Sequence, residues 1–335
     1  MPNALRWGIA AAGKISHDFC VALSTLPFDE HQMVAVAARD QKRAQEFADK
    51  HEIPKAFGSY AQLAECEDVD IVYIGALNPQ HYEICMLMLE HGKNVLCEKP
   101  LCINRKQAKK VIQYAEMKKL FLMEAVWSRF FPAYQYLRKQ IETGVLGEIQ
   151  EVNVEFGFPL NEVDRLQKRN LGGGTVLDLG IYTIQVSQWA FQEPPQEIKA
   201  QGTLNAEGVD VEVKAELHYP GKRVARMHLS ANDTLGNNAV IKGSKGQITL
   251  KQFWCPTKII DIDGQEKEWV LPKGKHPINF INSEGMRYEA EAVRQSILEG
   301  KLQNDTVSHN DSLLFAQIED EIRAQVGVVY DEDKV

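Results

Sequence analysis

The alternation of short apolar runs with amphipathic segments in the first 125 residues most constrains how this chain can fold. Five apolar runs have the length of buried strands, at residues 5–11, 33–38, 69–75, 94–97 and 121–124. Four segments between them have the spacing of amphipathic helices, at residues 15–26, 41–50, 82–90 and 105–117. Strands that are apolar on both faces are typical of a parallel sheet covered by helices on each side. The pattern therefore predicts a doubly wound parallel α/β sheet.

From residue 126 onward the pattern changes to that of a second domain. Helical spacing occurs at residues 129–143, 175–190, 284–299 and 311–326, and a strand is expected at residues 152–157. Between residues 198 and 271 apolar residues mostly alternate with polar ones, which is typical of antiparallel strands. Since 335 residues suit two cores better than one, we expect domains at residues 1–125 and 126–335. The second is predicted to be an α+β domain with a large, mostly antiparallel open sheet packed by helices.

Composition and charge argue against several kinds of partner. The formal net charge of -8 gives no basic surface for nucleic acid or for an anionic membrane. No segment is apolar and long enough to span a bilayer, and the first residues lack the pattern of a secretory signal. The six cysteines lack Cys-x-x-Cys spacing, and the histidines and carboxylates lack metal-ligand spacing. We therefore expect reduced thiols, no bound metal and a cytoplasmic protein.

The turn between the first strand and the first helix is where a dinucleotide would bind. Backbone amides and the positive end of the helix can hold a pyrophosphate there. The usual Gly-x-Gly-x-x-Gly pattern is altered, with Ala11 at its first position, Gly13 at its second and Ser16 at its third. A tight turn of small residues with a structural role would have a similar sequence. The position of this turn in the alternating pattern favours a Rossmann dinucleotide site.

The end of the second strand indicates which dinucleotide is bound. NAD enzymes usually have an acidic residue there that binds the ribose hydroxyls. Here Arg39 follows two alanines, and Arg43 lies one helical turn later. Because arginine can bind a 2′-phosphate with two hydrogen bonds, we expect NADP rather than NAD. The alternative is that both arginines are solvated at an exposed helix start, with Asp40 as the helix N-cap.

Lys99 is the first candidate for catalysis. The triplet Glu98-Lys99-Pro100 directly follows the fourth strand, and in open α/β sheets ligands bind beyond the carboxyl ends of the strands. Pro100 stiffens the chain as it leaves the strand. A lysine at a strand end can also be an ordinary surface residue, so the triplet alone proves little.

Longer motifs around this triplet point to a family. They are Asn78-Pro79-Gln80-His81, the run from His91 to Pro100, Glu124-Ala125-Val126-Trp127-Ser128-Arg129-Phe130-Phe131-Pro132, and Gly172-Gly173-Gly174-Thr175-Val176-Leu177-Asp178-Leu179-Gly180-Ile181-Tyr182. Together they resemble the Gfo/Idh/MocA family of NAD(P)-dependent oxidoreductases, and the likeness covers essentially the whole chain. Tyr182 stands where many relatives have histidine. In having this tyrosine, the chain resembles the branch of dimeric dehydrogenases that act on trans-dihydrodiols or on D-xylose.

The resemblance implies that Lys99 and Tyr182 meet beside the nicotinamide C4. Oxidation of an alcohol requires removal of the hydroxyl proton, and a free tyrosine, with a pKa of about 10, is a poor base near neutrality. We expect Tyr182 to transfer the proton and Lys99 to orient the substrate oxygen and lower the tyrosine pKa. The reverse assignment, with a neutral Lys99 as the base, stays open. Asp178 is expected to bind a second substrate hydroxyl, or else to be an ordinary acid in the first half of its helix.

The resemblance also implies a set of cofactor-binding residues. They are Gly8, Ala11, Gly13, Lys14, Ile15, Arg39, Arg43, Asn78, His81, Glu98, Lys99, Trp127 and Arg129. For His81, an equally good alternative is a packed or solvated side chain.

Aromatic residues are expected to line the substrate pocket. They are Trp127, Phe156, Trp254 and Phe280. Flat apolar walls suit both an aromatic dihydrodiol and the CH-rich face of a pyranose, so they do not choose between these substrates. Each aromatic residue taken singly could equally be ordinary core packing.

The large sheet of the second domain bears on the assembly. The resemblance implies that a second subunit often covers its outer face, so we expect a homodimer. The strand expected at residues 209–219 places its charged side chains on one face, which weakens this expectation. They are Glu212, Lys214, Glu216 and His218.

Two classes of function remain. The first is an NADP-dependent dehydrogenase that oxidises a trans-dihydrodiol to a catechol, or an aldose such as D-xylose to its lactone. A carbonyl or sugar reductase of the same family is the reverse alternative. The second class is a non-catalytic NADP-binding regulator. The presence of both Lys99 and Tyr182 favours the enzyme, because a regulator would have little reason to retain the pair.

Overall fold

The computed structural model describes residues 4–334, which divide into two compact units. Unit 1 contains the described residues up to Cys102 together with Lys106–Phe130 and Leu271–Ser312. Unit 2 contains Ile103–Arg105, Phe131–Val270 and the described residues from Leu313 onward.

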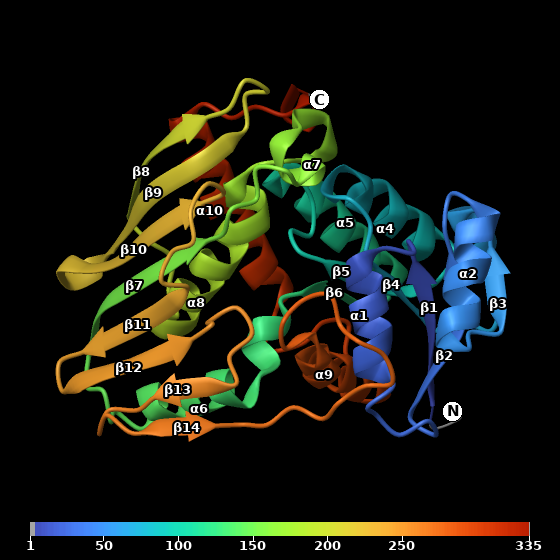
Figure 1. Ribbon diagram of the computed structural model, residues 1–335, viewed down its shortest axis with the longest axis horizontal. Coiled ribbons are helices and arrows are strands. Elements are labelled where there is room, and N and C mark those ends of the chain that lie inside the picture. The colour runs from blue at the N-terminus through green and yellow to red at the C-terminus, as the bar shows by residue number, and fades with distance from the viewer. Residues whose placement is uncertain (1–3, 335) are drawn as a thin grey trace. The chain divides into compact units, whose positions relative to one another are not determined.

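Unit 1 is built on a six-stranded parallel sheet with the strand order β3-β2-β1-β4-β5-β6 (Figure 1). The strands are β1 (Leu5–Ala10), β2 (His31–Ala37), β3 (Lys55–Phe57), β4 (Ile71–Ile74), β5 (Asn94–Glu98) and β6 (Leu122–Ala125). The helices are α1 (Lys14–Leu23), α2 (Gln41–His51), α3 (Tyr60–Ala64), α4 (His81–Glu90), α5 (Arg105–Lys118) and α9 (Met286–Leu298). Every residue of β4 and β6 is buried, as expected for strands covered on both faces. The predicted doubly wound sheet is confirmed.

The segment from residue 271 to 312 was expected in the second domain, but it packs with the parallel sheet in unit 1. Asp18 on α1 is fully buried, and its carboxylate accepts hydrogen bonds from this segment. The donors are the backbone and side-chain amides of Asn279, the backbone amide of Phe280 and the hydroxyl of Ser283. A buried carboxylate needs such donors. The sequence did not predict this contact, because the donors lie in an irregular segment before α9 that has no periodic pattern.

Unit 2 is built on an eight-stranded sheet with the order β14-β13-β12-β11-β7-β10-β9-β8. The strands are β7 (Ile149–Gly157), β8 (Glu197–Leu204), β9 (Asp210–Tyr219), β10 (Arg223–Ser230), β11 (Asn238–Gly243), β12 (Gly246–Lys251), β13 (Lys258–Ile260) and β14 (Glu266–Glu268). All neighbours pair antiparallel except β7 and β10, which are parallel, so the prediction of a mostly antiparallel sheet is confirmed.

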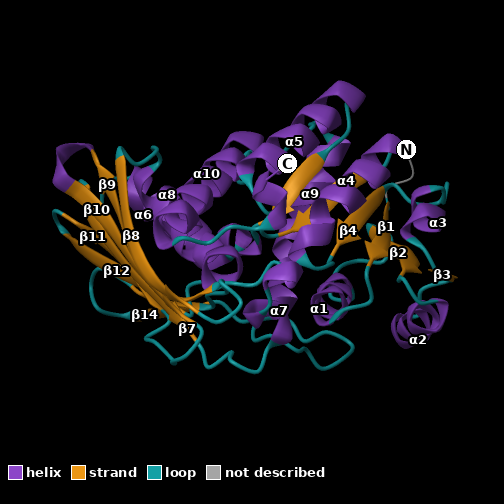
Figure 2. Cartoon of the chain, turned by 90° about the horizontal axis from the view of Figure 1, so that it is seen from above, coloured by secondary structure: helices purple, strands orange, loops and turns teal. Residues whose placement is uncertain are grey.

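One face of this sheet is covered by helices. These are α6 (Pro132–Glu142), α8 (Ile181–Phe191) and α10 (His309–Val326), which lie on the same side of the sheet in Figure 2. Strand β9 shows the consequence for its sequence, because Val213 and Leu217 are buried while Lys214 is exposed. Helix α8 is buried along its whole length.

Local differences from the sequence expectations have physical reasons. The helix expected at residues 129–143 begins only at Pro132, because proline is well suited to the first helical position and a short 3₁₀ turn (Trp127–Phe130) precedes it. The helix expected at residues 175–190 begins with a π-helical turn (Val176–Gly180). The elements α3, β3, β14 and α7 (Asp164–Gln167) are too short for a periodic pattern. No helix within residues 4–334 is long and apolar enough to cross a membrane.

Candidate active site

The turn before α1 has the geometry of a phosphate-binding loop. Ala11 has a φ of 81°, a left-handed conformation in which glycine is usually found. Gly13 is the N-cap of α1, and no side chain caps the helix there. The first backbone amides of this ten-residue helix are therefore available to an anion.

The residues around this turn also leave room for a phosphate. A Cβ atom on Gly13 would come no closer than 3.7 Å to its nearest neighbour, the carbonyl oxygen of Gly75, so the approach to the backbone is open. The Ser16 hydroxyl is buried and has no hydrogen-bond partner among the described residues. Gly8, by contrast, lies within β1, where a Cβ would press to 2.9 Å from Val69. The loop from Ala11 to Ile15 thus fits a dinucleotide, and Gly8 allows close packing of the sheet, while its contact with a cofactor stays a prediction.

The end of β2 brings two arginines near one tyrosine. Arg39 and Arg43 are exposed, and both lie close enough to Tyr60 to lower its pKa, although burial raises the pKa of this phenol more strongly. Asp40 caps α2 by accepting a hydrogen bond from the backbone N–H of Arg43 at 2.9 Å, which confirms its expected role as N-cap. Two guanidinium groups therefore stand at the strand end where the adenosine ribose of a dinucleotide would lie.

Lys99 lies in a tightly held turn at the end of β5. The Glu98 carboxylate is buried and accepts a 2.6 Å hydrogen bond from the Tyr73 hydroxyl. The Lys99–Pro100 peptide bond is cis, and the next amide, that of Leu101, donates to the Glu124 carboxylate at 2.9 Å. Lys99 itself is only partly exposed.

His81 braces the same turn from α4. Its Nδ1 lies 2.8 Å from the carbonyl oxygen of Pro100, and its Nε2 lies 3.1 Å from that of Ala76. Complete burial lowers the pKa of this imidazole. The contacts of His81 are thus those of a buried residue that fixes the chain beside Lys99, and its contact with a cofactor stays a prediction.

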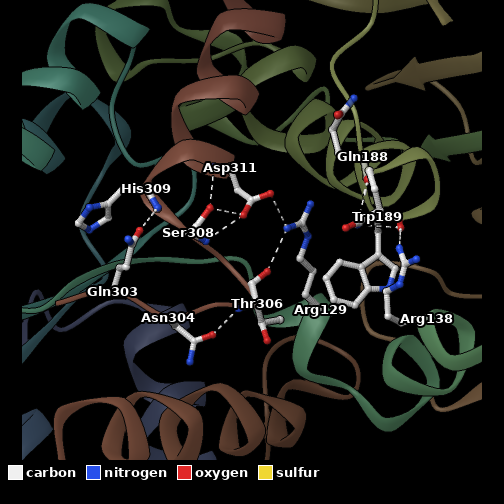
Figure 3. Close-up of polar contacts among 11 residues, drawn as sticks. Arg129, Arg138, Gln188, Trp189, Gln303, Asn304, Thr306, Ser308, His309 and Asp311 are labelled. Atoms are coloured by element: carbon white, nitrogen blue, oxygen red, sulfur yellow. Dashed lines mark hydrogen bonds and ion pairs between the residues drawn. The ribbon is translucent and has the colours of Figure 1, made fainter. Parts of the chain in front are cut away.

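The other expected cofactor residues of unit 1 differ in burial. Asn78 begins a 3₁₀ turn (Asn78–Gln80) and is partly exposed. Trp127 and Arg129 are each 2% exposed. Arg129 donates to the carbonyl oxygen of Thr306 and to the carboxylate of Asp311, both at 3.0 Å (Figure 3). Arg129 is therefore part of a buried ion pair that ties the 3₁₀ turn after β6 to the start of α10.

In unit 2, Asp178 and Tyr182 lie where a π-helical turn passes into α8. Single π-turns inside α-helices occur frequently at functional sites. Asp178 is buried and forms an ion pair with Arg165 of α7, with Nη1 to Oδ1 at 2.7 Å and Nη2 to Oδ2 at 3.4 Å. Arg165 was not predictable from the sequence, because the loop around it has no periodicity and no motif of its own.

A cluster of aromatic rings in unit 2 reaches Tyr182 through Phe156. Phe156 meets Tyr182 edge to face, with ring centroids 5.6 Å apart, and packs against Trp254 at 4.7 Å. Phe158, which the sequence analysis did not name, joins them at 5.6 Å from Trp254. These four rings are called the aromatic cluster below. The other two expected pocket residues, Trp127 and Phe280, belong to unit 1, where Phe280 is 39% exposed.

These features define a class of protein: an oxidoreductase with a Rossmann domain for a nicotinamide dinucleotide and a second domain with an open sheet. Residues 5–126 match the model of the oxidoreductase family with an NAD-binding Rossmann fold, and residues 134–249 match the GFO/IDH/MocA C-terminal domain.

Individual relatives agree with this class. The chain is 47% identical to a trans-1,2-dihydrobenzene-1,2-diol dehydrogenase of Danio rerio, over 98% of this chain and 99% of the relative. It is 43% identical to the Homo sapiens protein of the same name, over 99% of each. A 3-ketoreductase from Actinomadura kijaniata, solved with NADP and TDP-benzene, superposes with a TM-score of 0.82 at 25% identity, over 98% of this chain and 99% of the other.

This chain therefore belongs to the Gfo/Idh/MocA family of oxidoreductases. It is an NAD(P)-dependent enzyme, as expected, and the alternative of a non-catalytic regulator is set aside. Among residues 4–334, no three side chains of His, Cys, Asp or Glu are grouped in a way that could hold a metal ion.

Proposed function

We propose that this enzyme is an NADP-dependent dehydrogenase that oxidises a hydroxyl of a trans-dihydrodiol, or of an aldose such as D-xylose. The observation that supports this most is the aromatic cluster, because Phe156 packs beside the tyrosine proposed to move the proton and Trp254 packs against Phe156. Flat rings of this kind match a cyclic substrate with an apolar face. The name of the relatives at 42–47% identity points to a dihydrodiol.

The proposed chemistry divides the work between two residues. When bound, the oxidised nicotinamide would supply a hydride acceptor. Tyr182 would remove the hydroxyl proton, and Lys99 would orient the substrate oxygen and stabilise the charged phenolate. In this step the substrate would lose two hydrogens, one as a hydride to the nicotinamide and one as a proton to Tyr182. Asp178 would accept a hydrogen bond from a second substrate hydroxyl.

The test of this proposal is NADP reduction, followed by nicotinamide absorbance, with benzene trans-dihydrodiol and D-xylose. We expect turnover by the wild type and a loss of about a thousandfold or more in kcat for Tyr182→Phe and Lys99→Met. Tyr114→Phe on α5 is a matched control and should retain full activity. Normal NADPH binding without turnover on a panel of diols and sugars would contradict the proposal. Substantial turnover only in the direction of carbonyl reduction by NADPH would favour the reductase.

We also propose NADP as the preferred cofactor, because Arg39 and Arg43 place two guanidinium groups together at the end of β2. Arg39→Asp should move the ratio of kcat/KM values toward NAD by at least tenfold, since it replaces a phosphate ligand with an acid that binds ribose hydroxyls. Lys42→Asp makes the same charge change on the neighbouring exposed residue and should leave the ratio unchanged. An unchanged ratio of kcat/KM values in Arg39→Asp would show that Arg39 does not select NADP.

Localisation and assembly complete the proposal. All six cysteines are buried and free, which suits a reducing compartment, and we place the enzyme in the cytoplasm. The outer face of the eight-stranded sheet is proposed to bind a second copy of the chain, giving a homodimer.

A further inference from the structure

The ion pair between Arg165 and Asp178 joins a loop residue to a proposed substrate ligand. The guanidinium approaches both carboxylate oxygens, in the side-by-side geometry that fixes the plane of a carboxylate as well as its charge. The Asp178 side chain is 11% exposed and that of Arg165 is 40% exposed. The pair therefore lies at the boundary between the protein interior and the solvent, where it can meet a substrate.

The chain holds Arg165 in this place through the glycine run at 172–174. The backbone amide of Gly174 donates to the carbonyl oxygen of Leu166 at 2.9 Å, and that of Gly173 donates to the carbonyl oxygen of Lys168 at 3.1 Å. A Cβ on Gly173 would lie 2.6 Å from the Leu166 oxygen, closer than any side chain allows. The glycine run thus lets the loop with Arg165 pack directly against the start of the π-helical turn.

The other side of the glycine run is anchored as firmly. Asp210 of β9 is fully buried and accepts hydrogen bonds from the Thr175 hydroxyl at 2.5 Å and from the Val176 amide at 2.8 Å. The Tyr330 hydroxyl donates to the carbonyl oxygen of Gly173. The backbone on which Asp178 stands is therefore fixed at its start, and Arg165 fixes the side chain at its end.

We propose that Arg165 is a positioning residue that orients Asp178 and thereby selects substrates with two adjacent hydroxyl groups. This inference rests on the proposed function. A carboxylate in a fixed plane accepts a hydrogen bond from one particular direction. It therefore strengthens the binding of a substrate that has a second hydroxyl beside the reacting one. A mono-alcohol offers no such hydroxyl and gains nothing from the pair. Arg165 acts through Asp178 and is not itself a catalytic residue.

The experiment compares trans-cyclohexane-1,2-diol with cyclohexanol as substrates for NADP reduction. We expect the wild type to prefer the diol. Arg165→Met should lower kcat/KM for the diol by about tenfold or more, as loss of a charged hydrogen-bond partner does, and lower it for cyclohexanol by at most about threefold. Arg165→Lys retains the charge without the planar fork, so it should recover part of the preference. Asp178→Asn should reduce the preference at least as much as Arg165→Met does.

Controls separate this role from a structural one. Arg169→Met removes an exposed arginine from the same loop and should leave the diol preference and the NADP dissociation constant unchanged. Melting temperatures identify variants that fail to fold. If Arg165→Met is one of them, the inference requires that the diol preference of Arg165→Lys be smaller than that of the wild type. A diol preference as large as that of the wild type in every Arg165 variant that folds overturns the inference and leaves the proposed function standing. A wild type that binds NADPH but oxidises neither these substrates nor a sugar overturns the proposed function, and the inference with it.

Discussion

Three buried carboxyl groups lie in unit 1 near the turn that contains Lys99. Glu98 ends β5, Glu124 lies on β6 and Glu289 lies on α9. Burial raises the pKa of Glu289 well above its ordinary value, with a further contribution from the nearby Glu98, and neither of its carboxyl oxygens has a hydrogen-bond partner among the described residues. Burial also raises the pKa of Glu124, to about 7. The surroundings of Lys99 are thus less negative at neutral pH than the sequence suggests.

Glu124 should make the stability of the protein depend on pH. Its pKa in the folded protein, about 7, is above the ordinary value of 4.5, so the folded state binds the proton more tightly than the unfolded state does. The resulting stabilisation is fully present below about pH 4.5 and is lost as the pH rises through 7. We expect it to change the free energy of unfolding by about 3 kcal/mol across this window. Glu124→Gln, which cannot titrate, should remove this part of the pH dependence.

Urea unfolding of both proteins at several pH values between 4.5 and 8.5 measures the effect. Glu90→Gln on the exposed face of α4 is the matched control and should follow the wild type at every pH. Parallel curves for Glu124→Gln and the wild type would show that Glu124 stays ionised in the folded protein.

His81 provides a second prediction at the scale of one residue. Its Nδ1 is the group that can donate to the carbonyl oxygen of Pro100, and burial lowers the pKa of the ring, which favours its neutral form. His81→Leu has a similar volume but no donor. It should cost about 1–3 kcal/mol of stability, because it leaves a buried carbonyl group unpaired, and it should reduce kcat by releasing the turn beside Lys99.

His81→Asn is the control, because its side-chain amide can replace the Nδ1 donor. Stopped-flow turnover and thermal melts should rank the proteins as wild type, His81→Asn, then His81→Leu. Equal losses in the two variants would mean that the imidazole has a role beyond this hydrogen bond, such as contact with the cofactor.

At the scale of elements, the sequence predicted what depends on regular burial. The strands of the parallel sheet and the alternation along β9 follow directly from which faces are apolar. The π-helical turn from Val176 to Gly180 could not be predicted, because its apolar pattern is that of an α-helix and its extra residue per turn depends on tertiary packing. The position of the segment 271–312 depends on hydrogen bonds to Asp18, which leave no periodic signal.

The site was predictable to the extent that its residues lie in motifs at the ends of elements. Lys99 follows β5 directly, and the turn before α1 lies where the alternating pattern places it. Arg165 and Phe158 lie in or beside an irregular loop without a motif, and the Trp254 partner of Phe158 is far away in the sequence. The one available signal was the glycine run at 172–174. Three consecutive glycines indicate that another segment approaches the backbone closely, but they do not say which one.

The glycine run gives a prediction at the scale of elements. Gly173→Ala would press a Cβ against the backbone of Leu166 and Lys168, neither of which can move cheaply, so we expect a loss of about 1–3 kcal/mol in unfolding free energy. Gly180→Ala is the matched control, because its Cβ would stand at ordinary contact distances of 3.4 Å or more in helical backbone. It should stabilise the protein by up to about 1 kcal/mol.

Chemical denaturation of both glycine variants measures the expected loss of unfolding free energy in Gly173→Ala and the expected gain in Gly180→Ala. Equal stabilities for Gly173→Ala and the wild type would mean that the loop with Arg165 can move away from the glycine run. That result would also weaken the fixed geometry on which the role of Arg165 depends.

At the scale of the whole molecule, the outer face of the eight-stranded sheet, opposite the covering helices, carries a network of ion pairs. Arg226 of β10 lies 3.0 Å from Glu216 of β9 and 3.3 Å from Glu151 of β7, and His228 lies 3.0 Å from Glu212. The two-fold symmetry of a dimer brings the same patch of each copy together, so such a face must be complementary to itself in charge. Opposite charges that alternate from strand to strand meet this requirement without an apolar patch.

A dimer built on this face should be sensitive to salt and to the sign of Arg226. Raising the salt from 0.1 to 1 M shortens the screening length from about 10 to 3 Å, so the dissociation constant of the dimer should rise severalfold. Arg226→Glu places three like charges together and should raise it by at least tenfold, whereas Lys109→Glu on α5 makes the same charge change outside the face and should leave it unchanged. Sedimentation velocity over a range of protein concentrations measures all three values. If the wild type sediments as a monomer throughout, or if Arg226→Glu dimerises as tightly as the wild type, this face does not join two copies.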